Sequence, residues 1–399
     1  MTGRAVAAEM LSLESALRQL VKVVQRTPVE LASPNGALGR YAAGDVRAKR
    51  SQPCADLSAM DGFAVAGTEP WTVVGESRCG APFGGPIGPG QAAHISTGAV
   101  IPEGASAVLI KENAQLSDHT LQAIEHPEDG AHIRRKGFDF ATGEQVIAAG
   151  QRIGPAQLAL LIAAGCDAIN VGRPPRISIL ECGDELDAKA AKPGQLPPSN
   201  GAMLAAMCAS QACETTVSAP LPDDLGAIAE AIETAGSADL IVISGGASVG
   251  DHDLVRPALK SIGVEPDFWR VAIKPGKPLL VARRQKQLIL GLPGNPVSSF
   301  VTGFMFMLPA IRAMLGARDP WPARMYLPAA HDLPPVGPRR EFLRATIAPD
   351  GAIPLDQQDS SALLALSKAS CLIERPEHCG GLKAGTPVPV YLLGNGGNA

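Results

Sequence analysis

The sequence predicts a multidomain protein that combines an α/β unit with two β-rich units. At about 150 residues per domain, a chain of 399 residues is long enough for two to four domains with cores of their own. After residue 176, short apolar runs alternate with helical patterns, which is typical of βαβ units and a mostly parallel sheet. On both sides of that stretch, Gly and Pro are dense and short β-type runs appear.

The first part of the chain predicts a split domain with an insertion. Leu and Val recur at near-helical spacing over residues 11–24, which predicts an amphipathic N-terminal helix. A β-rich texture follows over residues 51–144, and a helical pattern resumes at 155–164. We therefore expect residues 1–50 and 145–175 to form a split helical domain around an inserted β-rich domain.

Residues 176–320 predict the α/β domain. The patterns indicate strands over 177–180, 215–218, 239–243 and 288–290, and helices over 200–207, 225–235 and 297–315. The last of these helices is expected to be interrupted near Pro309. After about residue 319 the helical pattern fades, and Pro-rich turns with runs such as 388–393 predict a small C-terminal β domain over 321–399.

Composition excludes several classes of partner. The net charge of −4 provides no basic field for nucleic acid, and an aromatic content of 4% argues against base-stacking surfaces. The longest apolar stretch, around residues 300–311, is too short to span a membrane. No secretory signal is visible and the eight cysteines are dispersed, so we expect reduced thiols and a cytoplasmic location.

Three Gly-containing turns each follow a predicted strand, at Gly183, at Gly245-Gly246 and at Gly294. Ligands of parallel sheets bind at the carboxyl ends of the strands, where Gly allows a close backbone approach and helix N-termini attract anions. Tight connections also need Gly for structure alone. The turns match neither the P-loop pattern nor the dinucleotide fingerprint, which disfavours both classes.

Charged residues next to these turns suggest an anionic ligand. Four acids lie in or beside them: Asp184, Glu185, Asp251 and Asp253. Carboxylates would repel a phosphate unless a divalent cation such as Mg²⁺ lay between them, although they could also be solvated acids or helix caps. Lys274 and Lys277 flank a Pro-Gly turn and could hold an oxyanion as point charges, or could form an exposed basic turn.

The β-rich module carries candidates of its own. Asp61 stands between small and apolar residues, which is unusual for a surface loop, and Ser96-Thr97-Gly98 forms a hydroxyl-rich turn. Arg134-Arg135-Lys136 is a basic run followed by Asp139, which could also be a solvated face. The sequence has no H-E-x-x-H and no G-x-S-x-G, so zinc protease and serine hydrolase chemistry lack support.

Seven motifs in fixed order carry a resemblance over essentially the whole chain. They are Ser58-Ala59-Met60-Asp61-Gly62-Phe63-Ala64-Val65, Thr97-Gly98 with Ile101-Pro102-Glu103-Gly104, Gly183-Asp184-Glu185-Leu186, Ser199-Asn200, Ser244-Gly245-Gly246-Ala247-Ser248-Val249-Gly250-Asp251, Lys274-Pro275-Gly276-Lys277-Pro278 and Gly291-Leu292-Pro293-Gly294-Asn295-Pro296-Val297-Ser298. This combination closely resembles the MoeA family, also called the gephyrin E-domain family.

The resemblance implies an elongated, four-part subunit with a molybdopterin-binding α/β domain and a C-terminal β-barrel-like domain. It implies a homodimer whose cleft lies near the subunit interface, with the inserted module of one chain facing the α/β domain of the other. It implies insertion of molybdate into adenylylated molybdopterin, with Mg²⁺ as cofactor and release of AMP. The implied partners are small-molecule substrates, an upstream adenylyltransferase and recipient molybdoenzymes, but no nucleic acid or membrane.

The resemblance also assigns roles by motif. The implied catalytic residues are Asp61, Thr97, Glu185, Asp253, Lys274 and Lys277, and Glu185 and Asp253 would hold the metal. The implied cofactor-binding residues are Gly183, Asp184, Asn200, Asp224, Ser244, Gly245, Gly246, Ser248, Asp251, Pro293, Gly294, Asn295, Pro296, Arg344, Ser360 and Ser361. Molybdate would be held by Lys274 and Lys277, by one of Ser360 and Ser361, and by Arg344.

Two departures and three alternatives accompany this reading. Cys182 and Ala247 replace residues common in the family, and neither change removes a charge. A molybdopterin adenylyltransferase shares the α/β domain but would not need the additional domains. A non-catalytic scaffold would need a trimerising domain, and a degenerate relative would have lost the charged positions.

Overall fold

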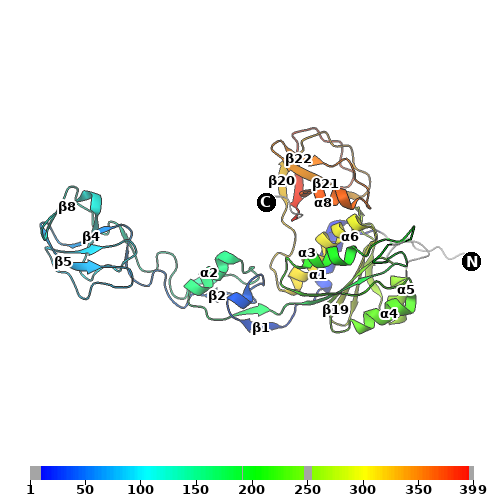
Figure 1. Ribbon diagram of the computed structural model, residues 1–399, viewed down its shortest axis with the longest axis horizontal. Coiled ribbons are helices and arrows are strands. Elements are labelled where there is room, and N and C mark those ends of the chain that lie inside the picture. Colours follow the sequence, from blue (N-terminus) through cyan, green and yellow to red (C-terminus); the bar gives the residue numbers. More distant parts are fainter. Residues whose placement is uncertain (1–9, 191, 247–253, 395–399) are drawn as a thin grey trace, which may run out of the picture.

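The computed structural model describes residues 10–190, 192–246 and 254–394. The molecule is elongated (Figure 1): a β module lies at one end, and a narrow segment carrying α2 (Pro155–Ala163) joins it to an α/β domain. A C-terminal β domain lies beside the α/β domain. This arrangement confirms the predicted class, a multidomain α/β plus β protein.

The α/β domain is built on one six-stranded sheet. Its strands are β13 (Arg176–Glu181), β14 (Glu214–Val217), β15 (Leu240–Ser244), β16 (Pro266–Trp269), β18 (Leu280–Arg284) and β19 (Gln287–Leu292), in the spatial order β14-β13-β15-β19-β18-β16. The first four run parallel, as predicted. Strand β18 runs antiparallel to β19 because only two residues join them, and such a connection permits only a hairpin; β16 in turn runs antiparallel to β18.

Helices cover both faces of this sheet. One face carries α1 (Leu13–Val23), α3 (Asn200–Cys208), α6 (Pro296–Thr302) and α7 (Leu308–Met314), and the other carries α4 (Leu225–Thr234) and α5 (Val255–Ser261). Successive side chains of β15 point to opposite faces of the sheet and so pack in two separate parts of the core. Leu240 and Val242 pack in one cluster, whereas Ile241 and Ile243 pack in the other.

The N-terminal helix α1 packs on the α/β domain. Ser12 caps it by accepting a hydrogen bond from Ser15 N, and its buried face is formed by Leu13, Ala16 and Leu20. That face contacts α7 and belongs to the α/β core. This differs from the expected grouping of residues 1–50, because an amphipathic pattern does not specify which surface the helix covers.

The longest helical segment is a core helix with a widened turn. Helix α6 continues through a π-helical turn at Gly303–Met307 into α7. Pro309 has no N–H to donate, and the widening lies directly before it, at the predicted interruption. The segment Pro296–Met314 is long and apolar enough to cross a membrane, but 83% of it is buried inside the protein, as expected for a core helix.

The neck, residues 28–48 and 144–172, joins the α/β domain to the β module. Strand β1 (Val29–Ala32) pairs antiparallel with β12 (Ile169–Gly172), and β2 (Val46–Arg47) pairs antiparallel with β11 (Gln145–Ile147). The chain therefore passes through the neck twice. Where we expected a helical domain, the structure has one α-helix and two short ribbons, because short apolar and Gly-rich runs support ribbons as readily as helical turns.

The β module contains a second six-stranded sheet with the order β7-β4-β6-β5-β9-β8. Its strands are β4 (Gly62–Ala66), β5 (Trp71–Ser77), β6 (Gln91–Ile95), β7 (Ala107–Ile110), β8 (Ala114–Ser117) and β9 (Thr120–Ala123), and β3 (Leu57–Ser58) pairs separately with β10 (Ile133–Arg134). Trp71, Phe63 and Leu109 pack in its core. The module thus has a hydrophobic core of its own.

The C-terminal domain contains a curled sheet of six strands. These are β17 (Ile273–Lys274), β20 (Met325–Pro328), β21 (Arg340–Ala348), β22 (Gly351–Pro354), β23 (Cys371–Arg375) and β24 (Pro387–Leu392), together with helix α8 (Leu363–Lys368). Ala329, directly after β20, bridges to Ala352 in β22, which curls the sheet. In the sequence, strand β17 lies between β16 and β18 of the α/β sheet, but it pairs with β21. It therefore joins the α/β domain to the C-terminal sheet.

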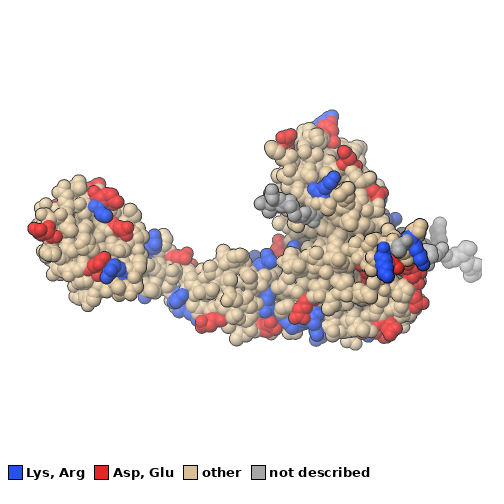
Figure 2. All heavy atoms as spheres, in the orientation of Figure 1, with Lys and Arg blue, Asp and Glu red and all other residues tan. Residues whose placement is uncertain are grey.

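Basic and acidic side chains are interspersed along the face drawn in Figure 2. That face carries no continuous basic surface of the kind that binds nucleic acid.

Candidate functional site

The three Gly turns converge at one edge of the α/β sheet. Strands β13, β15 and β19 are neighbours and run parallel, so their carboxyl ends meet there. Cys182 N donates to Ser244 O at 2.9 Å, and Gly245 N donates to Leu292 O at 3.2 Å. The second turn is therefore hydrogen-bonded to the ends of both neighbouring strands.

Gly245 is the residue on which this convergence depends. Its φ of +96° is unfavourable for other residues, and a Cβ there would lie 2.2 Å from Cys182 O. Gly246 also has a positive φ, +64°. A Cβ on Gly294 would lie 3.5 Å from Gly245 Cα, an ordinary contact that brings the third turn against the second. Three predicted residues of the second turn lie outside the described residues: Ser248, Asp251 and Asp253.

Asn200 joins the second and third turns from the first residue of α3. Its Nδ2 donates to Gly294 O at 2.6 Å and to Ser244 Oγ at 3.1 Å. Ser244 Oγ in turn lies 3.3 Å from Ser299 Oγ on α6. Asn200 is only 7% exposed, so its amide holds the backbone of the site instead of facing solvent.

Glu181, which our sequence analysis did not single out, anchors the same region. Its buried carboxylate accepts hydrogen bonds from Asn200 N at 3.1 Å and Gly201 N at 2.9 Å. A carboxylate at a helix N-terminus satisfies free N–H groups and complements the helix dipole. The available signal was an acid directly after the apolar run Ile179-Leu180, at the last position of the strand.

The acids of the first turn lie close to a pair of acids that precede α4. The Glu185 carboxylate folds over Gly183, where a Cβ would lie 2.7 Å from its oxygens. Asp184 and Asp223 exchange hydrogen bonds, each carboxylate accepting from the other's backbone N–H, at 3.0 and 3.4 Å. Asp224 Oδ1 accepts from Ala227 N at 2.8 Å and caps α4, which favours a helix-cap role over its predicted role toward the ligand.

Carboxylate oxygens are the donors that Mg²⁺ prefers, and Glu185 is exposed beside the turns. Within the described parts of the chain, no three His, Cys, Asp or Glu residues group closely enough to hold a metal ion.

The lysine turn packs on α6, next to the second Gly turn. Gly276 has a φ of +105°, and a Cβ there would lie 2.6 Å from Thr302 Cγ2. Thr302 is one helical turn beyond Ser299, which contacts Ser244. The lysine turn and the second Gly turn therefore flank the same face of one helix. Lys274 Nζ donates to Glu341 Oε1 at 2.8 Å.

The third turn is fixed from the C-terminal domain. Pro293 is buried and Pro296 begins α6, so both ends of the turn are restrained. Asn295 Nδ2 donates to Ser360 Oγ at 3.0 Å, and Val297 N donates to Ser360 O at 3.1 Å. Ser361 lies next to this contact, with its hydroxyl donating to Asp359 Oδ1.

Arg344, in β21, presents a buried cation in the same region. Its side chain is fully buried, and Nη2 donates to Gln357 O and Asp359 O, both at 3.0 Å. Nε and Nη1 are buried without a hydrogen-bond partner in the described structure. Burial lowers the pKa of Arg344, which shows that this environment penalises the charge. A negative charge bound nearby would offset this cost.

Asp61 and Thr97 form a unit in the β module. Thr97 donates from its backbone N at 2.6 Å and from Oγ1 at 2.9 Å, both to Asp61 Oδ1. These hydrogen bonds, the backbone one first, lower the pKa of Asp61. Asp61 borders a cavity of about 540 Å³, which is also lined by Glu76, His94 and Lys111.

The structure does not bring Asp61 and Thr97 to the Gly turns of the same chain, because the module lies at the far end of the molecule (Figure 1). Arg134 and Asp139 also lie in the module. Arg134 is exposed on β10, and Asp139 N donates to Gln52 O. These predicted residues thus form a second group, separate from the α/β edge.

Three family models match the chain in order. They are "MoeA N-terminal region (domain I and II)" at residues 11–165, "Probable molybdopterin binding domain" at 178–313 and "MoeA C-terminal region (domain IV)" at 326–393. The breaks between the matched regions lie where the neck meets the α/β domain and where that domain meets the C-terminal domain.

The similarity to known proteins extends over nearly the whole chain. The molybdopterin molybdenumtransferase of Haemophilus influenzae is 32% identical over 96% of this chain and 100% of its own length. The protein of the same name from a Nostoc species is 33% identical over 78% of this chain and 75% of its own. A solved structure of a molybdopterin biosynthesis moeA protein from Pyrococcus horikoshii OT3 has a TM-score of 0.84 at 25% identity, covering 96% and 100% of the two chains.

Proposed function

The chain belongs to the MoeA family, and from this we propose that it inserts molybdate into adenylylated molybdopterin with Mg²⁺-dependent release of AMP. The coarser part follows from family membership: the protein is a transferase of molybdenum cofactor biosynthesis that inserts molybdenum. The adenylylated substrate, the cation and the nucleotide product are our proposal. The observation that carries it is the convergence of three Gly turns, a lysine turn and a buried Arg around α6.

The Gly turns would bind the pterin phosphates. Gly294 is exposed and Gly246 is half-buried at the carboxyl edge of the sheet, where an anion can approach the backbone closely, and the buried Gly245 packs against Gly294. Asn200 and Glu181 keep that backbone in place without contacting the ligand. Helix α6 begins at this edge and its N-terminus favours negative charge, whereas the Glu181 carboxylate already occupies the N-terminus of α3.

Molybdate would bind between the lysine turn and the C-terminal domain. Lys274 and Lys277 supply positive charge at the turn, and the buried guanidinium of Arg344 adds positive potential without direct contact. Ser360 lies beside the third turn and could contribute a hydroxyl. Holding the oxyanion beside the dithiolene sulfurs accelerates the transfer by proximity and orientation.

Mg²⁺ would be held by Glu185 and Asp253, of which Asp253 lies outside the described residues. When bound, the cation neutralises the charge that develops as the phosphoanhydride breaks. We also propose a cytoplasmic location, which is supported by the fact that all eight cysteines are free.

We further propose a homodimer with the cleft near its interface. Asp61 and Thr97 lie far from the Gly turns of their own chain, so a partner's module could complete the site. The neck exposes apolar side chains that a partner could cover: Val29 is 59% exposed, Leu31 70% and Ile162 55%.

The test is to incubate the purified protein with adenylylated molybdopterin, Mg²⁺ and molybdate, and to measure AMP. We expect release only when molybdate and Mg²⁺ are both present. Formation of adenylylated molybdopterin from ATP and molybdopterin would indicate an adenylyltransferase instead, and no reaction in either assay would indicate a scaffold.

The variants Lys277→Ala and Asp61→Ala should fold normally and lose molybdate-dependent AMP release, by about tenfold or more. Lys383→Ala is the matched control, because Lys383 is a surface lysine paired with Asp332 in the C-terminal domain. Wild-type turnover in the Lys277 variant would contradict the role assigned to that lysine.

A further inference from the structure

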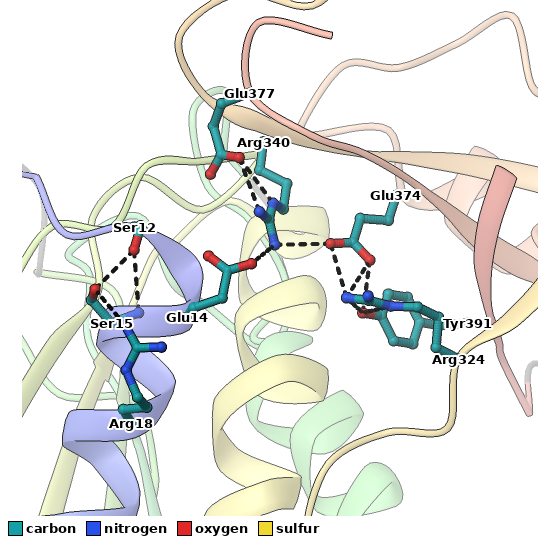
Figure 3. Close-up of polar contacts among 9 residues, drawn as sticks. All are labelled: Ser12, Glu14, Ser15, Arg18, Arg324, Arg340, Glu374, Glu377 and Tyr391. Carbon is teal, nitrogen blue, oxygen red and sulfur yellow. Dashed lines mark hydrogen bonds and ion pairs between the residues drawn. The ribbon is translucent and has the colours of Figure 1, made fainter.

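A buried ionic cluster fixes the strand that faces the lysine turn (Figure 3). The Arg340 side chain is 10% exposed and is surrounded by carboxylates from separate segments. It contacts Glu374 at 3.0 Å, Glu377 at 3.0 Å and Glu14, which comes from α1. A buried Arg held by several carboxylates has one well-defined position, so β21 is anchored at this residue.

The cluster extends further into the C-terminal domain. Glu374 also accepts from Arg324, at 2.8 Å, and from Tyr391 OH, at 2.9 Å (Figure 3). With Arg324 preceding β20, Glu374 on β23 and Tyr391 on β24, the cluster ties these elements to α1 of the α/β domain. The start of β21 is therefore held in place from two sides, by α1 of the α/β domain and by β23 of the C-terminal sheet.

The residue after Arg340 is the one that contacts the lysine turn. In the parallel pairing of β17 with β21, Ile273 lies opposite Arg340, and Lys274 lies opposite Glu341. Arg340 N donates to Ala272 O at 2.8 Å, which closes the pairing next to the anchor. Glu341 accepts from Lys274 Nζ at 2.8 Å, and its side chain is only 17% exposed, whereas that of Lys274 is 56% exposed.

We propose that Glu341 is a positioning residue, which holds the Lys274 ammonium where it binds the oxyanion substrate. The proposal rests on the proposed function, in which Lys274 binds molybdate. Lysine has a flexible four-carbon stem and loses rotamer freedom when it binds an anion. A carboxylate on an anchored strand restricts that freedom in advance, so substrate binding has less side-chain motion to freeze.

A carboxylate near an oxyanion also repels it. Variants of Glu341 that change either the length or the charge of the side chain distinguish this repulsion from positioning. Glu341→Asp keeps the charge but shortens the side chain by one methylene group, and so removes the contact with Lys274. Glu341→Gln removes the charge but keeps the length and an acceptor oxygen. Positioning predicts that the Asp variant is impaired and that the Gln variant is close to the wild type.

The experiment measures molybdate-dependent AMP release at varied molybdate concentrations with the full chain. We expect Glu341→Ala and Glu341→Asp to raise KM for molybdate about three- to tenfold, the scale of one ordinary hydrogen bond, with kcat within about twofold. Glu341→Gln should stay within about twofold of the wild type. In a Lys274→Ala background, Glu341→Ala should have no additional effect, because Glu341 acts through Lys274.

Asp332→Ala is the matched control, since it removes a carboxylate from another lysine pair of the same domain and should leave KM unchanged. The proposal is overturned if Glu341→Ala lowers KM or leaves it unchanged, if the Asp variant matches the wild type, or if the Lys274→Ala background leaves the effect intact. If Glu341→Ala does not fold, the Asp and Gln variants decide alone.

Hydrogen exchange of the peptide spanning residues 271–280, measured without substrate, separates this proposal from the proposed function. Faster exchange in Glu341→Ala than in the wild type supports the positioning contact even if the wild type releases no AMP. In that case the proposed function fails while the contact stands. Unchanged exchange together with an unchanged KM refutes the positioning role.

Discussion

Asp61 is an exposed acid whose charged form is stabilised by hydrogen bonds from Thr97. Two hydrogen bonds from Thr97 stabilise the carboxylate, and the pKa of Asp61 lies below its ordinary value of 3.8 for that reason. A carboxylate fixed in this way keeps both its charge and its orientation. Such an acid suits a site that must present a negative group at a defined place.

Thr97→Val removes the hydroxyl donor but keeps the size of the side chain and the backbone N–H. We expect the pKa of Asp61 to rise toward its ordinary value, and an NMR titration of the carboxyl carbon measures this. A lowered folded-state pKa stabilises the fold above the unfolded-state pKa, and this stabilisation is lost as pH falls through the folded-state pKa. The variant should therefore lose stability on acidification at a higher pH than the wild type. An unchanged Asp61 titration would contradict this.

Some residue roles could be predicted from the sequence and others could not. Turn residues such as Gly245 and Lys274 stand in motifs that indicate a ligand. The role of Asp224 depends on which backbone N–H lies in reach, and that is set by where α4 begins. The role of Glu181 and the free donors of Arg344 depend on burial, which arises from distant segments that a local pattern does not specify.

Among the elements, the second Gly turn has little room for change. It lies between the carboxyl ends of β13 and β19, and both neighbours are hydrogen-bonded to it or to its strand. The third turn contacts it at Gly294 without a positive φ. The two turns therefore allow a comparison between a Gly needed for folding and a Gly needed for access to the ligand.

We expect Gly245→Ala to destabilise the protein by about 2–5 kcal/mol, because a left-handed backbone and a Cβ overlapping Cys182 O both carry a cost. Gly294→Ala should leave the free energy of unfolding nearly unchanged and weaken substrate binding, since its Cβ would occupy space at the exposed edge. Denaturant unfolding and AMP-release kinetics measure the two effects. Equal stabilities of the two variants would refute the distinction.

Element types were predictable where the pattern is local. The βαβ rhythm predicted the parallel strands and α4, and Pro309 predicted the irregular turn before α7. The antiparallel pair β16–β18 was not predicted, because an apolar strand has the same appearance in either direction. The packing of α1 was not predicted either, since its apolar face could cover any domain.

For the whole molecule, the distance between the β module and the α/β edge is the main constraint on the proposed mechanism (Figure 1). One chain presents Asp61 and Thr97 at one end and the Gly turns at the other. The order of domains along the chain was predictable from composition. Their spatial separation was not, because no local signal specifies how the neck is oriented.

We expect the protein to have twice the mass of its 41.1 kDa chain in light scattering, as a homodimer. Leu31→Glu, which places a charge on the exposed apolar surface of the neck, should yield a monomer. Because that surface is far from the core of the α/β domain, the thermal stability of the domain should persist while AMP release is lost. A monomeric wild type with full activity would contradict the dimer.

The double passage of the chain through the neck has a mechanical consequence. Gly143 N donates to Ala48 O and Ala48 N donates to Glu144 O, so the outgoing and returning backbones are fastened to each other where they meet the module. Proteolytic cleavage of either passage would leave the module tethered by the other. The β module is thus held by two passages of the chain, and its release by a protease requires cleavage of both.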